Sequence, residues 1–329
     1  MLESDSELMY HRKPKRKSLI TSGLVSIISV FVTQLTLFLL PQLLPNSSLL
    51  ALLPLSALLL MFVVGLGRCC KKLLGVRASA PAFVFFTIIF IWAVYVYVVR
   101  QVISPVMDVV FNLEIVMVVI GLLCIMSVDP GFVKDRSSCL NTVVKSYPNE
   151  VEEHGGVVKQ ESLTEESFRL LRRVRYCWNC DNYIMGFDHH CPAFGTCIGQ
   201  KNHFFFILLL AGFVTCEASY FAYASQYHAK SLISTDVGRE LATASRNLVL
   251  GTMLFSLIQV VWQVVFIVWH IYCACFNIKT DEWINWEKYP EFHVGVIPCS
   301  GITQTAMQFK NPYDKGIVNN LKDFITGKE

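Results

Sequence analysis

The chain has 329 residues, of which 53% are hydrophobic and only 16% are charged, and its formal net charge is +3. Soluble domains average about 25% charged residues, so this composition, with a mean hydropathy of +0.48, argues against a soluble globular protein. The small positive charge also gives no support for a nucleic-acid-binding protein.

The hydrophobic residues gather in long runs. About 20 apolar residues in a helix are needed to cross the hydrocarbon core of a bilayer. Runs that approach or exceed this length lie at 19–43, 49–67, 81–100, 105–128, 203–226 and 247–274. The first run is too long for the apolar part of a signal peptide and lacks a small-residue cleavage site. We therefore predict an all-α polytopic membrane protein with six transmembrane helices.

Basic segments predict the orientation of these helices. "HRKPKRKS" (11–18) precedes the first run, and "RCCKKLLGVR" (68–77) separates the second from the third. Lys and Arg are enriched in cytosolic loops, so both segments are expected in the cytosol. The predicted order is a cytosolic N-terminus (1–18), four helices (19–128), a cytosolic domain (129–202), two helices (203–274) and a cytosolic tail (275–329).

A polar segment follows the fourth run, which ends at the turn signal "VDPG" (128–131). "SLTE" (162–165) is typical of a capping box that opens a short basic helix, "ESFRLLRRVR" (166–175). Its residues Arg172, Arg173 and Arg175 allow two interpretations: a solvated basic face beside the lipid, or a cradle for an anionic ligand such as a phosphorylated cofactor.

The stretch "CWNCDNYIMGFDHHCPAFGTC" (177–197) concentrates metal-ligating side chains. Cys177 and Cys180 form a C-x2-C pair, and two further ligands would complete a tetrahedral zinc site. Reducing conditions in the cytosol disfavour the alternative use of cysteines in disulfides. The candidates for the remaining ligands are His189, His190, Cys191 and Cys197.

These four candidates outnumber the two positions that remain on a zinc ion already bound by Cys177 and Cys180. A spare cysteine and a spare histidine beside Asp188 would be the parts of an activated thiol nucleophile. A purely structural zinc site without chemistry is the alternative interpretation of the same spacing. The few polar residues within the runs form no evident relay, which disfavours a transporter; they include Asp108, Glu114, Glu217 and His270.

"FDHHCP" (187–192), followed by "CIGQKNHFFF" (197–206), resembles the cysteine-rich domain of the DHHC protein S-acyltransferases, or palmitoyltransferases. "DPG" (129–131), "NIKTDE" (277–282) and "NPYDKGIVNNLKDF" (311–324) resemble further motifs of that family, although Lys279 replaces the first Thr of a Thr-Thr-x-Glu motif. The resemblance covers about residues 105–324 and implies a small cytosolic zinc-binding domain between the fourth and fifth helices.

The resemblance implies a role for each residue of the cluster. Cys191 would be the nucleophile that accepts the acyl group, with His189 as its base and Asp188 orienting that base. Counting ligands gives the same partition, because one histidine and one cysteine complete the C-x2-C pair and leave Cys191 free. The expected ligands of one structural zinc ion are Cys177, Cys180, His190 and Cys197.

The implied reaction transfers a long-chain acyl group, usually palmitoyl, from acyl-CoA to cysteines of membrane-associated substrate proteins at the cytosolic face. Lys201 and the three arginines are the candidates to meet the CoA phosphates. The expected location is an endomembrane, of the ER or Golgi, or the plasma membrane. The expected partners are therefore acyl-CoA, substrate proteins and the lipid bilayer.

The sequence also departs from the family pattern. Tyr176 and Tyr183 stand where a histidine and a cysteine would serve a second zinc site, and Ala193 replaces a Trp. We expect one zinc ion per chain and an active enzyme with a reduced domain. A non-catalytic zinc-bearing membrane adaptor is the alternative.

Overall fold

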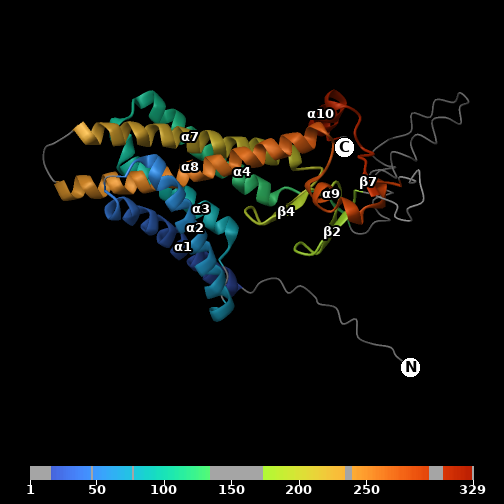
Figure 1. Cartoon of the computed structure of the whole chain (residues 1–329), viewed down its shortest axis with the longest axis horizontal. Helices are drawn as coiled ribbons and strands as arrows, with labels where there is room; N and C mark the ends of the chain where they lie inside the picture. Colours follow the sequence, from blue (N-terminus) through green and yellow to red (C-terminus); the bar gives the residue numbers. More distant parts are fainter. Residues whose placement is uncertain are drawn as a thin grey trace, which may run out of the picture. The chain divides into compact units, whose positions relative to one another are not determined.

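The computed structural model describes residues 16–45, 47–75, 78–133, 173–233, 239–295 and 307–327. Six helices in these ranges are long and apolar enough to cross a membrane, which confirms the predicted number of spans. They are shown in Figure 1 and comprise α1 (Arg16–Leu43), α2 (Leu49–Leu74), α3 (Ala80–Tyr97), α4 (Pro105–Ser127), α7 (His203–Ile233) and α8 (Arg239–Cys275).

The last two helices extend beyond the apolar runs from which they were predicted. Helix α7 continues to Ile233 and α8 already begins at Arg239. The extensions contain polar residues such as Lys230 and Arg246. A helix needs apolar side chains only where it meets hydrocarbon, so hydropathy locates the membrane crossing and not the helix ends.

The chain divides into two units, one of residues 1–116 and 215–260 and the other of residues 117–214 and 261–329. In the first unit, helices α1, α2 and α8 share a core of Leu40, Leu52 and Leu254. A Cβ atom at Gly251 would lie 3.0 Å from the backbone of Leu37. Glycine therefore permits the close approach of α8 to α1 in this unit.

Two acidic side chains of the first unit, Asp108 and Glu114, have partners within it. Asp108, at the start of α4, accepts a hydrogen bond from Tyr95 and lies 2.8 Å from the guanidinium of Arg100. Glu114 accepts a hydrogen bond from Ser219 on α7. Such pairing satisfies polar groups that hydrocarbon cannot solvate, so these acids serve helix packing and give no support for a transport pathway.

The second unit contains short strands that the sequence analysis did not predict. Its elements besides helix segments are β1 (Phe132–Val133), β2 (Arg175–Cys177), β3 (Asn182–Ile184), β4 (His189–Cys191), β5 (Thr196–Ile198), β6 (His293–Gly295) and β7 (Met307–Phe309). The sheets are antiparallel, with the order β1-β3-β2 in one and the pairs β4-β5 and β6-β7 in the others. Strands this short carry too little alternation to be predicted from a sequence.

In this unit, the prediction of a basic helix over residues 166–175 was wrong at the C-terminal end of that helix. The expected basic helix would have reached Arg175, but Arg173 lies in a turn and Arg175 begins β2. The pairing of Arg175 with Ile184 of β3 supplies ladder hydrogen bonds that override the local helix preference. Its start, the capping box at 162–165, lies outside the described residues, as does Arg172.

The tail after α8 folds back onto the second unit. It forms α9 (Thr280–Ile284), the single turns Trp286–Lys288 and Pro290–Phe292, and α10 (Ile317–Thr326). Asn320 of α10 donates a hydrogen bond to the carbonyl of Cys275, the last residue of α8. Phe324 of α10 packs against His203, the first residue of α7, with ring centroids 5.0 Å apart. The "NIKTDE" and "NPY" motifs thereby pack within the second unit, which also contains strands β2 to β5.

Candidate active site and metal centre

Strand β4 consists of only three residues, His189, His190 and Cys191. Successive side chains of a strand point to opposite faces, so His189 and Cys191 share one face and His190 occupies the other. The register of β4 with β5 places His190 directly opposite Cys197. Two adjacent histidines are thus directed into two different environments.

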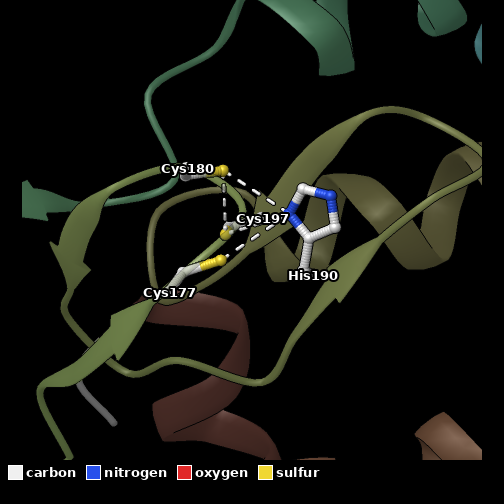
Figure 2. Close-up of side chains that lie close together, drawn as sticks. All are labelled: Cys177, Cys180, His190 and Cys197. Atoms are coloured by element: carbon white, nitrogen blue, oxygen red, sulfur yellow. Dashed lines mark hydrogen bonds between the residues drawn. The ribbon is translucent and has the colours of Figure 1, made fainter. Parts of the chain in front are cut away.

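The face of His190 holds a cluster of four metal-ligating side chains. The Nδ1 atom of His190 lies 3.7 Å from the sulfur of Cys177, 3.5 Å from that of Cys180 and 3.6 Å from that of Cys197. Figure 2 shows the three sulfur atoms turned toward one edge of the imidazole. With Zn–S near 2.3 Å and Zn–N near 2.0–2.1 Å, a tetrahedral site requires S···N separations of roughly 3.6 Å. The donor set therefore fits a metal ion of this kind.

The local fold brings these ligands together. Cys177 ends β2, Cys180 lies in the turn that follows, and Asp181 closes this turn with the left-handed φ of 53°. A hydrogen bond involving Cys197 lowers the pKa of Cys177 to about 5, and the same contact raises the pKa of Cys197. An ionised Cys177 thus disfavours ionisation of the neighbouring Cys197. A bound cation would neutralise this repulsion and allow both sulfur atoms to be thiolates.

The opposite face of β4 holds a carboxylate, an imidazole and a thiol. Asp188 is fully buried, and its Oδ2 atom lies 2.7 Å from Nδ1 of His189. Its other oxygen accepts a hydrogen bond of 2.8 Å from the backbone N–H of Thr280 in α9. Burial favours the neutral acid, but the nearby histidines outweigh it and hold the pKa of Asp188 well below its usual range.

His189 is tuned by the same contacts. Burial favours its neutral form, but the hydrogen bond to Asp188 and the nearby Cys191 thiol raise the pKa of His189 to about 9. Its Nε2 atom is buried and accepts no other hydrogen bond from the described residues. An imidazole of raised pKa with a free nitrogen next to a thiol is a good proton acceptor for that thiol.

A second polar group, which the sequence analysis did not bring together, lies behind Asp188. His203 opens α7 and His270 lies near the end of α8, and the Nε2 atom of the former is 3.3 Å from the Nδ1 atom of the latter. Each imidazole has a nitrogen within 4 Å of an Asp188 oxygen, at 3.9 and 3.8 Å. The one signal in the sequence was that both histidines stand near the ends of predicted spans, at 203–226 and 247–274.

Comparisons with known proteins find a family match over the part of the chain that contains these residues. A family model described as DHHC palmitoyltransferase matches residues 161–287, a range that includes every residue of both clusters. Palmitoyltransferase ZDHHC17 of Danio rerio is 27% identical over 207 residues, which are 60% of this chain and 31% of that protein. By this match, residues 161–287 are a DHHC palmitoyltransferase domain.

Further relatives come from insects and plants. Palmitoyltransferase Hip14 of Drosophila melanogaster is 25% identical over 205 residues, covering 60% of this chain and 30% of that protein. Probable protein S-acyltransferase 1 of Arabidopsis thaliana is 27% identical over 157 residues, covering 47% and 40% respectively. The matches thus span less than half the length of each of these relatives.

The two tyrosines that depart from the family pattern form a contact of their own. Tyr176 of β2 lies directly opposite Tyr183 of β3, with ring centroids 5.2 Å apart in an edge-to-face arrangement. Trp178 packs against Tyr176 at 4.8 Å. Aromatic cross-strand pairs stabilise antiparallel strands by about 0.5–1.5 kcal/mol. Aromatic packing therefore links the two strands at the position where the pattern would place ligands of a second zinc ion.

The residue at the other departure also packs in an apolar environment. Ala193 replaces a Trp of the family pattern, and its neighbour Phe194 is buried. Phe194 stacks on Phe213 of α7 with centroids 6.2 Å apart and contacts Phe206 at 5.9 Å. Aromatic packing just beyond Cys191 is thus provided by Phe194.

The arginines expected to bind phosphate lie in other settings. Arg173 is 3% exposed and forms an ion pair with Glu282 at 2.9 Å, with Asn277 at 2.6 Å from the same guanidinium. The guanidinium also stacks over the Tyr313 ring at 3.7 Å. These contacts are structural, because they join the start of the domain to the "NIKTDE" and "NPY" motifs. Neither a solvated face nor a phosphate cradle describes Arg173.

The other two described candidates for phosphate contacts, Arg175 and Lys201, are more accessible than Arg173. Arg175 pairs with Glu291 at 3.1 Å and lies over the Tyr289 ring at 3.9 Å. Lys201 pairs with Asp129 at 2.7 Å, and both of these side chains are about half exposed. An exposed pair contributes little to stability, so Lys201 can exchange its partner for an anionic ligand.

Proposed function

We propose that this chain is a protein S-acyltransferase that uses Cys191 as its nucleophile. It takes a long-chain acyl group, usually palmitoyl, from acyl-CoA and passes it to cysteines of membrane-associated substrate proteins at the cytosolic face. The observation that carries the proposal is the shared face of β4, where Cys191 stands next to His189 and His189 is bonded to Asp188 at 2.7 Å. The palmitoyltransferase family match over residues 161–287 supports the same reaction.

In the first step, the Cys191 thiol passes its proton to Nε2 of His189. The resulting thiolate attacks the carbonyl carbon of the acyl-CoA thioester, a new C–S bond forms, and the bond to the CoA sulfur breaks. His189 returns the proton to the departing CoA thiolate. The carboxylate of Asp188 keeps the His189 proton on Nδ1 and stabilises the imidazolium.

In the second step, a substrate cysteine gives its proton to His189, and its sulfur attacks the acyl-Cys191 thioester. Cys191 leaves as the thiolate and recovers the proton. One thioester replaces another in each step, so the free energy changes little. The main tasks of the protein are to supply a thiolate and to place the reacting groups.

The membrane location has a physical reason in the acyl donor. Each buried CH2 group contributes about 0.8 kcal/mol, so a 16-carbon chain gains about 12 kcal/mol on leaving water. A small cytosolic loop offers no apolar volume for such a chain, whereas transmembrane helices next to Cys191 do. The CoA head would remain in the cytosol, where Lys201, Arg175 and Arg172 are the candidate phosphate contacts.

The cluster of Cys177, Cys180, His190 and Cys197 would hold one zinc ion. The contribution of the ion would be structural, because four protein ligands leave no open position for a substrate. Its binding free energy would hold the hairpins in register and so place Cys191.

The test is acylation of purified protein by palmitoyl-CoA. Wild type is expected to acquire a hydroxylamine-sensitive label that is absent from Cys191→Ser and retained by Cys124→Ser, a control at an exposed helix position. A labelled Cys191→Ser protein would contradict the proposal, and an unlabelled wild type would favour the zinc-bearing adaptor. The proposed orientation predicts that a reporter glycosylation site near residue 150 stays unmodified.

A further inference from the structure

His203 and His270 form a buried pair of imidazoles that the proposed reaction does not use directly. They are 2% and 0% exposed, and the Nε2 atom of His203 lies 3.3 Å from the Nδ1 atom of His270. One of these nitrogens must carry a proton that it donates to the other. The other ring nitrogens, Nδ1 of His203 and Nε2 of His270, are buried without a hydrogen-bond partner among the described residues, so the mutual bond is what offsets the burial of the two rings.

The pair stands against the far side of Asp188. Its nitrogens lie 3.9 and 3.8 Å from the two carboxylate oxygens, too far for hydrogen bonds but in van der Waals range. The carboxylate is bonded directly to His189 and to the backbone N–H of Thr280. The imidazole pair therefore closes the remaining side of Asp188 and restricts rotation of the carboxylate.

The ring of His270 also stands behind His189. Their centroids are 5.5 Å apart, and Phe206 contacts His189 at 5.5 Å from another side. His270 is itself held by Phe266 at 4.6 Å and by Phe206 at 5.0 Å, both edge to face. Aromatic neighbours thus fix the plane of His270, and His270 in turn limits the positions that the His189 ring can take.

A metal ion is the competing explanation, since ligand atoms of Asp188, His203 and His270 all lie within 4.8 Å of one another. Two observations favour the hydrogen-bonded pair. Asp188 already accepts a bond of 2.7 Å from His189, and the buried Lys279 ammonium lies close enough to act electrostatically on both imidazoles. A cation beside an ammonium group would be repelled.

We propose that His203 and His270 are positioning residues for the acyl transfer, acting through Asp188 and the ring of His189. Their mutual hydrogen bond sets the distance between the ends of α7 and α8 in this unit and holds the Asp188–His189 pair so that Nε2 of His189 faces Cys191. This inference rests on the proposed function, because it assigns the pair a role in that reaction.

The test uses amides that imitate one imidazole nitrogen at a time. The amide of Asn occupies the place of Nδ1 and that of Gln the place of Nε2. His270→Asn and His203→Gln therefore preserve a partner for the hydrogen bond, whereas His270→Gln and His203→Asn place the amide elsewhere. The control is His228→Asn, further along α7.

The preserving variants are expected to keep kcat for autoacylation within about 10-fold of wild type, and the displacing variants to lose about 10²-fold or more with little change in KM for palmitoyl-CoA. Equal kcat in the two members of both pairs would overturn the proposal. So would a zinc content that falls by one ion in His270→Asn while the cluster on the other face of β4 stays loaded. Two independent pairs keep the test decisive if one variant fails to fold.

The outcome is separable from that of the proposed function. If wild type carries no label on Cys191, the acyltransferase proposal fails, and the positioning role fails with it because that role is defined for this reaction. If wild type is labelled and all four variants match it, only the positioning role fails.

Discussion

The two faces of strand β4 differ more than their sequence suggests. His190 faces three cysteine sulfurs at 3.5–3.7 Å, in a set that fits a tetrahedral metal ion. His189, one residue earlier, faces a carboxylate and aromatic rings and shares its side with Cys191. We therefore propose that the same residue type serves as a metal ligand on one face and as a proton acceptor on the other, because strand alternation separates the two histidines and their packed neighbours differ.

The largest effect is expected from removing one ligand of the proposed metal site. Cys180→Ser removes one of four ligands, and a module this small owes much of its folding free energy to the metal. We expect loss of zinc and loss of acylation together, measured by metal analysis and by label from palmitoyl-CoA. Cys191→Ser should lose the label alone. An unchanged zinc content in Cys180→Ser would show that these residues are not the ligands.

The next effect comes from the reactive face. Asp188→Asn keeps the size of the side chain but removes the charge. An amide N–H directed at Nδ1 of His189 would favour the tautomer protonated on Nε2, which cannot accept the proton of Cys191. By analogy with other Asp–His–nucleophile sites, we expect kcat to fall by about 10²–10⁴-fold with zinc retained. Single-turnover acylation kinetics would measure this. A loss of less than 10-fold would mean that Asp188 does not act through His189.

A third substitution tests the buried ion pair between Arg173 and Glu282, which joins the start of the domain to the "NIKTDE" motif. Arg173→Met leaves the buried Glu282 without its guanidinium partner, and breaking a buried ion pair costs about 3–5 kcal/mol. The matched control, Lys315→Met, breaks the more exposed pair with Asp323 and should cost about 1 kcal/mol or less. Thermal unfolding in detergent measures both. Equal destabilisation would remove the structural role assigned to Arg173.

The smallest effect concerns pH. Burial, and then the charge of Arg173, lower the pKa of Lys279 from 10.5 to about 8. Between these values the unfolded chain binds the proton and the folded protein does not, so stability rises with pH. The full effect is about 3 kcal/mol. We expect the stability of wild type to rise from pH 8 to 10.5 relative to Lys279→Met; a constant difference would contradict the burial of this ammonium.

The sequence predicts the parts of this molecule that rest on strong patterns. Length and hydropathy predict six spans, and the C-x2-C spacing with the DHHC motif predicts which side chains gather. It does not predict contacts between residues far apart in the chain, such as Arg173 with Glu282 or His203 with His270. Those contacts depend on tertiary packing at the ends of α7 and α8. The short strands were also missed, although the alternation along β4 is what separates His189 from His190.

The central claim is that the adjacent histidines of β4 have different roles. The most direct measurement is the zinc content of His189→Ala and His190→Ala, purified side by side and assayed for acylation. We predict that His189→Ala keeps its zinc ion and loses most of its acylation, whereas His190→Ala loses the zinc ion as well. Loss of zinc from His189→Ala, or full zinc in His190→Ala, would contradict the account.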